Sequence, residues 1–392
     1  MKRRLPALLA PLALLLALSP LGSDPGLAGA SPRHAPGRSV RDEIGRKVQV
    51  PLHPRRIVSL APSVTETLFA LGAVKLPAAI SAYAFGDYYF VLKQHKPELE
   101  DQNGFWLRRV YLTYESDISD KFKARARMEF NSAGNFSTSA SNITPYLKDA
   151  YISYQYAPLH KLTVGIQDRL AFGNIEKFYG YRHLEKTMFD LYKNRSSRDF
   201  AIDFSGAFDA AKKLNYSVQF GNYSGNKNET DKYKQVGARF FVNVTPELMI
   251  EVNGDISTVS GVKTSTLYQA FAGYKGDWGR LGLNIGQEMV KEDGKEDVNM
   301  AVVSAFAVAK LGSKFEAVAR YDMSMDPQLH GQGDYLLIEK GYKTNLAILG
   351  LAWNIHPKFQ IMPNIKMVSY KENNGIKPAS DTYFNITWYY QF

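Results

Sequence analysis

Basic side chains recur at every second position of one short segment, where Lys123, Arg125 and Arg127 are separated by alanines. Because successive side chains of a β-strand point to opposite faces, this spacing puts three cations on one face. Arg109 is expected on the neighbouring strand, with the same parity as Tyr111. A row of cations along a water-filled wall can guide anions, so the pattern predicts a surface that favours anions.

The same faces also carry acids, which leaves a second interpretation open. Arg239, Arg320 and Lys366 lie on the more polar faces of other predicted strands and extend the candidate channel lining. If the acids pair with these cations, the charges hold the structure together and set no selectivity. The acids expected on these faces are Glu129, Asp149, Asp203, Glu251, Glu288 and Asp322.

Patterns typical of enzymes are weak in this chain. His183 and Glu185 are close in sequence but have no further metal-ligand partner at a useful spacing. No nucleophile elbow, phosphate-binding loop or dinucleotide fingerprint occurs, and there is no cysteine. We therefore expect no catalytic residue, metal or cofactor, although an enzyme built on a barrel stays as an alternative.

The last segment, 381–392, indicates what kind of element carries these charges. Its residues alternate strictly between an aromatic or aliphatic face and a more polar face, as a half-buried β-strand does. An aromatic strand that ends the chain on Phe392 suits a bacterial outer-membrane β-barrel, although an edge strand of a soluble sandwich would look alike. We expect Trp388, Tyr390 and Phe392 to form the signal that the barrel-assembly machinery reads.

The connections between strands favour the barrel. Short turns near residues such as 120, 158–160, 245–246 and 356–357 alternate with longer links, among them 92–104, 131–146, 258–263 and 326–341. Short turns at one end and long loops at the other are the outer-membrane arrangement. We predict an all-β, transmembrane, antiparallel barrel of about sixteen strands over residues 75–392, with both termini in the periplasm.

The longest link, 168–198, follows the fifth predicted strand and carries aromatic residues at helix-like spacing. A barrel of about sixteen strands is too wide for side chains to fill, so something must narrow it. We predict that this loop folds into the lumen and forms the constriction, because its aromatic side chains need burial. The charged residues expected at the constriction are Glu176, Lys177, Arg182, Glu185, Lys186 and Asp190.

The amino-terminal region differs from the rest in charge and pattern. Residues 1–30 combine a basic start, an apolar run and small residues at 28–30, which predicts a secretory signal peptide. Of the formal net charge of +10, residues 75–392 contribute only +4, so the high isoelectric point does not indicate nucleic-acid binding.

Residues 41–73 predict a short strand at 56–60 and a capping-box helix from Ser63 to Gly72. This segment resembles the start of the periplasmic binding proteins for vitamin B12 and iron–siderophore complexes. One β–α unit lacks a partner strand and a core of its own, so 31–74 is expected to be non-functional alone. A gene fusion or an artefact of sequence assembly accounts for it better than a working domain, and a substrate-binding protein remains an alternative function.

Residues 80–392 resemble the phosphate-selective porin family in several short motifs, which are 105–111 (FWLRRVY), 147–151 (LKDAY), 196–200 (SSRDF) and 220–225 (FGNYSG). The resemblance implies passive diffusion of small hydrophilic solutes through a trimeric barrel of sixteen strands, surrounded by outer-membrane lipid and lipopolysaccharide. It also implies an anion preference that rests on ladders of Arg and Lys. This chain shows only part of such a ladder, so we expect the preference to be modest.

Overall fold

A computed structural model describes residues 37–41, 45–51, 78–132, 136, 142–332 and 334–392. The chain divides into two units, Met1–Lys75 and Leu76–Phe392. In the first unit, β1 (Gly37–Arg41) and β2 (Lys47–Pro51) pair antiparallel. The strand expected at 56–60 and the helix expected at 63–72 lie outside the described residues, so the interpretation of this segment stays a prediction.

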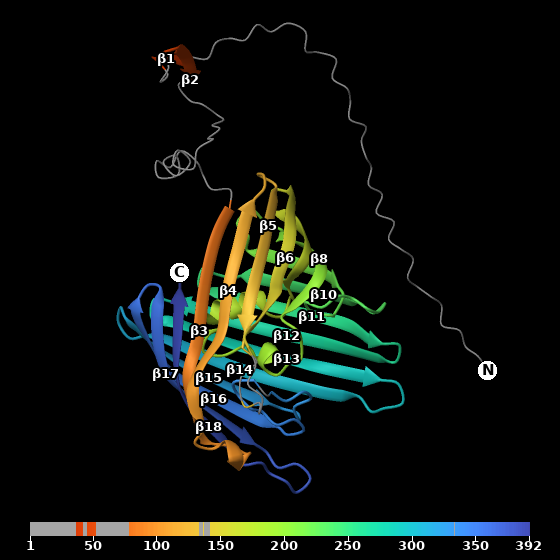
Figure 1. The fold of residues 1–392 in the computed structure, drawn as a ribbon. Coiled ribbons are helices and arrows are strands. Elements are labelled where there is room, and N and C mark those ends of the chain that lie inside the picture. Colours follow the sequence, from red (N-terminus) through yellow and green to blue (C-terminus); the bar gives the residue numbers. More distant parts are fainter. Residues whose placement is uncertain (1–36, 42–44, 52–77, 133–135, 137–141, 333) are drawn as a thin grey trace, which may run out of the picture. The chain divides into compact units, whose positions relative to one another are not determined.

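The second unit is a closed barrel of sixteen antiparallel strands, which confirms the predicted fold class (Figure 1). Each strand pairs with its neighbours in sequence, and the last strand closes the ring by pairing with the first. The strands are β3 (Ala78–Lys93), β4 (Asn103–Asp117), β5 (Phe122–Asn131), β6 (Thr144–Ala157), β7 (His160–Asp168), β8 (Arg198–Ala207), β9 (Leu214–Gly221), β10 (Gln235–Asn243), β11 (Leu248–Ser260), β12 (Lys263–Gly276), β13 (Gly279–Glu292), β14 (Val298–Lys310), β15 (Phe315–Ser324), β16 (Thr344–His356), β17 (Phe359–Tyr370) and β18 (Asp381–Gln391).

Burial in the barrel wall is the reverse of that in a soluble protein. On β8 the outward-facing Ile202 is 39% exposed, whereas the inward-facing Asp203 is 6% exposed. The outer face is apolar and the polar groups lie inside, as the hydrocarbon core of a membrane requires. Among the described residues, no helix is long and apolar enough to cross a membrane.

The connections alternate in length around the ring. The predicted short turns fall between strands, and most predicted links contain long loops, such as 169–197 between β7 and β8 and 325–343 between β15 and β16. The link predicted at 258–263 is wrong, because only two residues separate β11 from β12. Polar residues at these strand ends continue the ladder across a β-bulge between Thr258 and Ser260, so polarity there does not mark a loop.

Two β-bulges place consecutive charged residues inside the barrel. Phe85 pairs with Arg109 while Gly86 pairs with Leu107, so Arg108 is the extra residue of β4. On β6 the extra residue is Lys148, and it lies next to Asp149. An extra residue in one strand shifts the alternation of side chains by one position. All four charged side chains are therefore buried inside the barrel, and none faces lipid.

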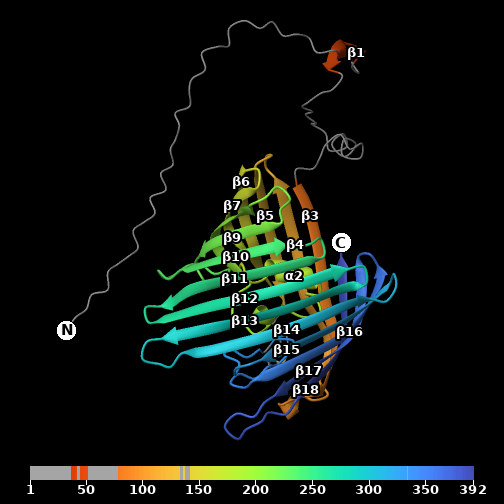
Figure 2. The ribbon, with the colours of Figure 1, turned by 180° about the vertical axis from the view of Figure 1, so that it is seen from behind.

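The loop 169–197 fills one side of the interior. It carries α2 (Gly173–Tyr179) and α3 (Met188–Leu191), and the ribbon of α2 lies within the ring of strands (Figure 2). Apolar side chains of both helices form a core with inward-facing residues of β12 and β14–β17. This contact explains why β16 is apolar on both faces, because one face meets lipid and the other meets the loop. Part of loop 325–343 joins this core through Leu336 and Ile338. The polar space that remains lies along the other strands.

The alternation of the wall can be tested with two nearby positions on β8. Ile202→Arg puts a charge on the lipid face and should cost about 2–4 kcal/mol near the bilayer midplane. Ser205→Arg adds the same side chain on the inner face and should leave assembly nearly unchanged. The amount of folded, heat-modifiable barrel in outer membranes measures this difference. Equal yields of the two variants would contradict the assigned faces.

Candidate functional site: the polar half of the barrel interior

A cavity of about 900 Å³ lies between loop 169–197 and the walls formed by β3, β5–β10 and β16–β18. Its position near Lys161 and Pro357 places it toward the short-turn end of the barrel. More cations than carboxylates line it, which makes its surface electropositive. The cations are Arg125, Arg127, Lys161, Lys177, Arg182, Arg198 and Arg239, and the carboxylates are Asp149, Asp168, Glu176 and Asp203.

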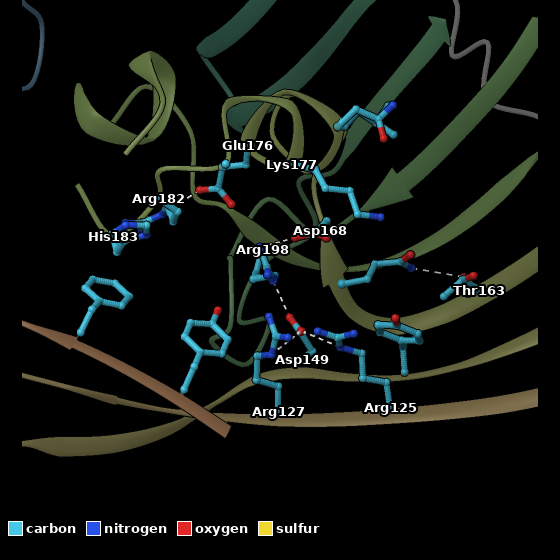
Figure 3. Close-up of a pocket in the computed structure, with 18 of the residues that line it drawn as sticks. Arg125, Arg127, Asp149, Thr163, Asp168, Glu176, Lys177, Arg182, His183 and Arg198 are labelled. Carbon is cyan, nitrogen blue, oxygen red and sulfur yellow. Dashed lines mark hydrogen bonds and ion pairs between the residues drawn. The ribbon is translucent and has the colours of Figure 1, made fainter. Parts of the chain in front are cut away.

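Three of the arginines converge on one carboxylate (Figure 3). Arg125 Nε lies 3.1 Å from Asp149 Oδ2, Arg127 Nε lies 3.7 Å from the same atom, and Arg198 bonds to Asp149 Oδ1. Strand register causes this convergence, because Arg127 is directly opposite Asp149 across the β5–β6 ladder. Arg125 also pairs with Glu115, and Arg198 pairs with Asp168. These ion pairs reduce the attraction that the three arginines exert on any other anion.

Other cations of the cavity are not neutralised in this way. In the part of the chain that the structure describes, Lys161, Lys177 and Arg239 make no ion pair. Arg239 donates a hydrogen bond to the carbonyl of Leu170, at 3.3 Å, and Glu251 of the next strand acts on its charge only from beyond ion-pair distance. These three residues come from β7, α2 and β10, so they surround the cavity from three elements. We call them the unpaired cations.

The predicted channel lining is dispersed in the structure. Arg125, Arg127 and Arg239 line the cavity, whereas Lys123 lies outside it, 64% exposed, and pairs with Asp117 at 3.0 Å. The other three predicted residues are buried in ion pairs, which are Arg109 with Glu129 at 3.0 Å, Arg320 with Asp322 at 2.5 Å, and Lys366 with Glu185 at 2.8 Å.

The buried charges form a layer beyond the cavity, toward the long loops. Glu129 forms an ion pair with Arg109 and accepts a hydrogen bond from Lys148, whose Nζ lies 2.5 Å from Glu129 Oε2. Arg108 pairs with Asp87 at 3.2 Å and donates to the carbonyl of His183 at 3.0 Å. Tyr335, from loop 325–343, covers this layer, and its ring lies 4.8 Å from the Arg108 guanidinium carbon.

Loop 169–197 is tied to strands on several sides of the ring. Its Asn174 donates to Glu251 of β11 at 2.7 Å, and its Arg195 bonds to Glu288 of β13 at 2.6 Å. Lys366 of β17 donates to the carbonyl of Leu184 at 2.8 Å. Contacts with strands that are so far apart in the ring place the loop inside the barrel.

The charged residues predicted for the constriction largely pair with one another. Arg182 contacts Glu176 at 2.7 Å and Asp190 at 3.2 Å, and Lys186 lies 3.7 Å from Asp334 of loop 325–343. Only Glu176, Lys177 and Arg182 of this set line the cavity.

Two ionisable groups of the loop have strongly displaced pKa values. Burial alone would raise the pKa of the Glu185 carboxyl, but Lys366 and Arg108 outweigh it and hold that pKa below its usual range. Burial lowers the pKa of His183 to about 4, so its ring is neutral at pH 7. The Nε2–H of His183 donates a hydrogen bond to Gln360 Oε1, at 2.6 Å. Among the described residues, no group of three or more metal-ligating side chains occurs.

Several residues of this region were missed from the sequence, namely Arg108, Lys148, Arg198 and Lys161. A signal for the first three was present, because each is adjacent to another charged residue. Strict alternation would put one charge of each adjacent pair in lipid, so each pair marks a bulge or a strand end.

The predicted assembly signal lies on the outer face of β18. Tyr390 and Phe392 are exposed, and their rings stack with centroids 5.5 Å apart. Phe392 exchanges backbone hydrogen bonds with Ala82, which ties the end of the chain to the first barrel strand.

Comparisons with known proteins agree with this architecture. Residues 82–249 match the profile of the family described as phosphate-selective porin O and P. No curated protein matches the chain in sequence. An anion-selective porin from Comamonas acidovorans has a TM-score of 0.59 at 13% identity, over 80% of this chain and 100% of that one.

Two further solved structures share the fold at similar scores. The outer-membrane channel DcaP of Acinetobacter baumannii has a TM-score of 0.58 at 11% identity, over 80% of this chain and 97% of that one. OmpF of Salmonella typhi, in complex with daunomycin, has a TM-score of 0.58 at 12% identity, with the same coverage of both chains. At these identities, the likeness shows the barrel fold.

The link between Lys366 and Glu185 predicts how firmly the loop is held. Removing one partner of a buried ion pair typically costs about 3–5 kcal/mol, because the other charge stays buried and unpaired. Lys366→Met should therefore loosen loop 169–197 and expose its Lys186 to trypsin. Lys123→Met removes an exposed pair worth about 0–1 kcal/mol and should leave the loop protected. Equal resistance to trypsin in both variants would contradict the role of the Lys366–Glu185 pair in holding the loop.

Proposed function

We propose that this outer-membrane barrel of the phosphate-selective porin type is a passive channel for small hydrophilic solutes, with a modest preference for anions. The observation that carries the proposal is the cavity, where seven cations face four carboxylates. No energy source or cofactor is needed, because solutes move down their own gradients.

The unpaired cations account for the anion preference. In water, one charge at about 8 Å changes the energy of an ion by about 0.5 kcal/mol, or roughly twofold in local concentration. The arginines around Asp149 contribute less, since the carboxylates that they contact compensate part of their charge. A modest preference therefore follows from Lys161, Lys177 and Arg239 more than from the row on β5.

Loop 169–197 is proposed to form the constriction, together with the buried layer around Arg109, Glu129 and Lys148. The support is its position inside the ring and its core contacts, which remove one side of the lumen from the solute path. Tyr335 of loop 325–343 narrows the lumen at the same depth as this buried layer, from the long-loop end of the barrel.

The remaining proposals concern assembly and placement. Short turns of outer-membrane barrels are periplasmic, so both ends of this barrel belong in the periplasm. Residues 1–30 are proposed to be the signal peptide, and the outer aromatic face of β18 is proposed to be read by the barrel-assembly machinery. A homotrimer in contact with outer-membrane lipid and lipopolysaccharide is the proposed assembled form.

Removal of the unpaired cations tests the proposed function. The triple variant Lys161→Gln, Lys177→Gln, Arg239→Gln should lower the anion-to-cation permeability ratio at least about twofold, because these charges lie beside the solute path. Reversal potentials in planar bilayers under a KCl gradient measure this ratio. The effect should shrink at high salt, where the Debye length falls to about 3 Å at 1 M.

A matched control removes three cations that lie outside the cavity. Lys123, Lys263 and Lys291 pair with acids near the ends of the barrel, and their substitution by Gln changes the net charge by the same amount. The reversal potential should stay close to that of the wild type. A wild-type preference for cations, or equal shifts in both triple variants, would contradict the proposal.

Residues 31–74 are proposed to be dispensable for the channel. The barrel consists of sixteen strands that begin at Ala78, and its ring closes without the earlier residues. Deleting 31–74 while keeping 1–30 should leave the amount of heat-modifiable barrel and the single-channel conductance unchanged. Loss of the folded barrel would show that the segment is needed for assembly.

A further inference from the structure

Aromatic rings form one side of the cavity. Tyr83 and Phe85 come from β3, Tyr389 from β18 and His183 from loop 169–197. The His183 and Tyr389 ring centroids are 4.8 Å apart, and those of Tyr83 and Tyr389 are 5.8 Å apart. We call these four residues the aromatic wall. Tyr83 and Tyr389 are only partly buried, so their rings border the open space.

The unpaired cations come from other parts of the ring. Arg239 is on β10, which is eight strands from β18 in the ring of sixteen and therefore on the opposite side. Lys161 is on β7, four strands from β3. In Figure 3, His183 and Arg182 lie on one side of the cavity, and Lys177 and Thr163 lie toward the other. The unpaired cations thus face the aromatic wall across the cavity, whereas the ion-paired Arg127 and Arg182 lie beside it, with the Arg127 guanidinium carbon 5.8 Å from the Tyr83 ring centroid.

The volume of the cavity is large for an inorganic anion. A tetrahedral oxyanion displaces roughly two or three water molecules, each about 30 Å³. The cavity of about 900 Å³ is instead in the range of sites that hold organic molecules, roughly 300–1,000 Å³. An inorganic ion there can approach the cations without touching the rings.

We propose that this cavity takes organic anions that carry an aromatic ring, with the ring on the aromatic wall and the anionic group toward the unpaired cations. The inference rests on the proposed function, because it names the solute class that the same cavity favours. Aromatic rings attract one another in offset and edge-to-face arrangements beyond the effect of buried area. Charge-assisted hydrogen bonds from Lys or Arg can hold either a carboxylate or a phosphate.

The state of His183 supports the division of the cavity. Because burial lowers its pKa to about 4, the imidazole carries no charge at pH 7. It therefore extends the surface of Tyr389 and does not add a cation to that side. Phe85 packs edge-on against it, with ring centroids 6.5 Å apart, which fixes its position.

Two probe anions separate aromaticity from charge and size. Benzoate and cyclohexanecarboxylate both carry one negative charge at pH 7 and six-membered rings, but only benzoate is aromatic. Each is added to a wild-type channel that conducts chloride, and the half-blocking concentration is measured in planar bilayers. Benzoate should block at a concentration between about two- and about twelvefold lower than cyclohexanecarboxylate.

Variants of the aromatic wall test whether the wall causes the difference in block between the two probes. The double variant Tyr83→Leu, Tyr389→Leu should bring the ratio of the two half-blocking concentrations close to one, while the chloride-to-potassium permeability ratio stays unchanged. Tyr389→Phe keeps the ring and should keep the ratio. If the double variant fails to assemble, Tyr389→Leu alone should still lower the ratio. The triple variant of the unpaired cations should weaken block by both probes to the same degree.

The outcomes separate this inference from the proposed function. Equal block by the two probes, in a wild-type channel that still prefers chloride to potassium, would overturn the aromatic site and leave the anion channel standing. A wild-type channel with no preference for chloride would overturn both. A lower ratio in the leucine variants, with chloride preference intact, would establish the wall as the site of discrimination.

Discussion

A charged side chain that faces lipid near the middle of the bilayer costs about 2–4 kcal/mol, and this cost organises the barrel described above. It keeps charges away from the middle of the outer face, and it accounts for the two bulges that turn Arg108 and Lys148 away from the membrane. Once inside, the charges are confined with one another, so most of them form ion pairs. In the proposed channel, selectivity rests on the few cations left unpaired.

The second organising feature is that the interior is divided. Loop 169–197 brings its own apolar residues and forms a core with β12 and β14–β17, so this side of the barrel is packed like a soluble domain. Glycines on β13 make room for the aromatic rings of Phe189 and Phe306. A side chain at Gly286 would come within 2.5 Å of the Phe189 ring, and one at Gly282 within 2.3 Å of the Phe306 ring. The polar side of the interior holds the cavity.

Much of the fold could be predicted from the sequence, because period-two patterns and alternating connection lengths depend only on local chemistry. The faces of β5 and β18 and the approximate strand count follow from these patterns alone. The site was harder to predict. Whether Arg127 is free or paired depends on Asp149 across the ladder. The bulge that sets this register cannot be recognised when strictly alternating side chains are assumed. Likewise, Lys161 has no neighbours in sequence that reveal its position beside the cavity. The link at 258–263 was mistaken for a loop because polar strand ends resemble loops.

The packed side of the barrel has an electrical consequence for the open side. A dense apolar core polarises far less than water, so field lines from the cations are repelled from it and concentrated into the remaining aqueous path. A passing ion therefore experiences a stronger potential than it would in a wide, fully hydrated tube with the same residues. Under the proposed function, the low polarisability of loop 169–197 lets a few lysines and arginines influence permeation, although the unit as a whole carries little excess charge.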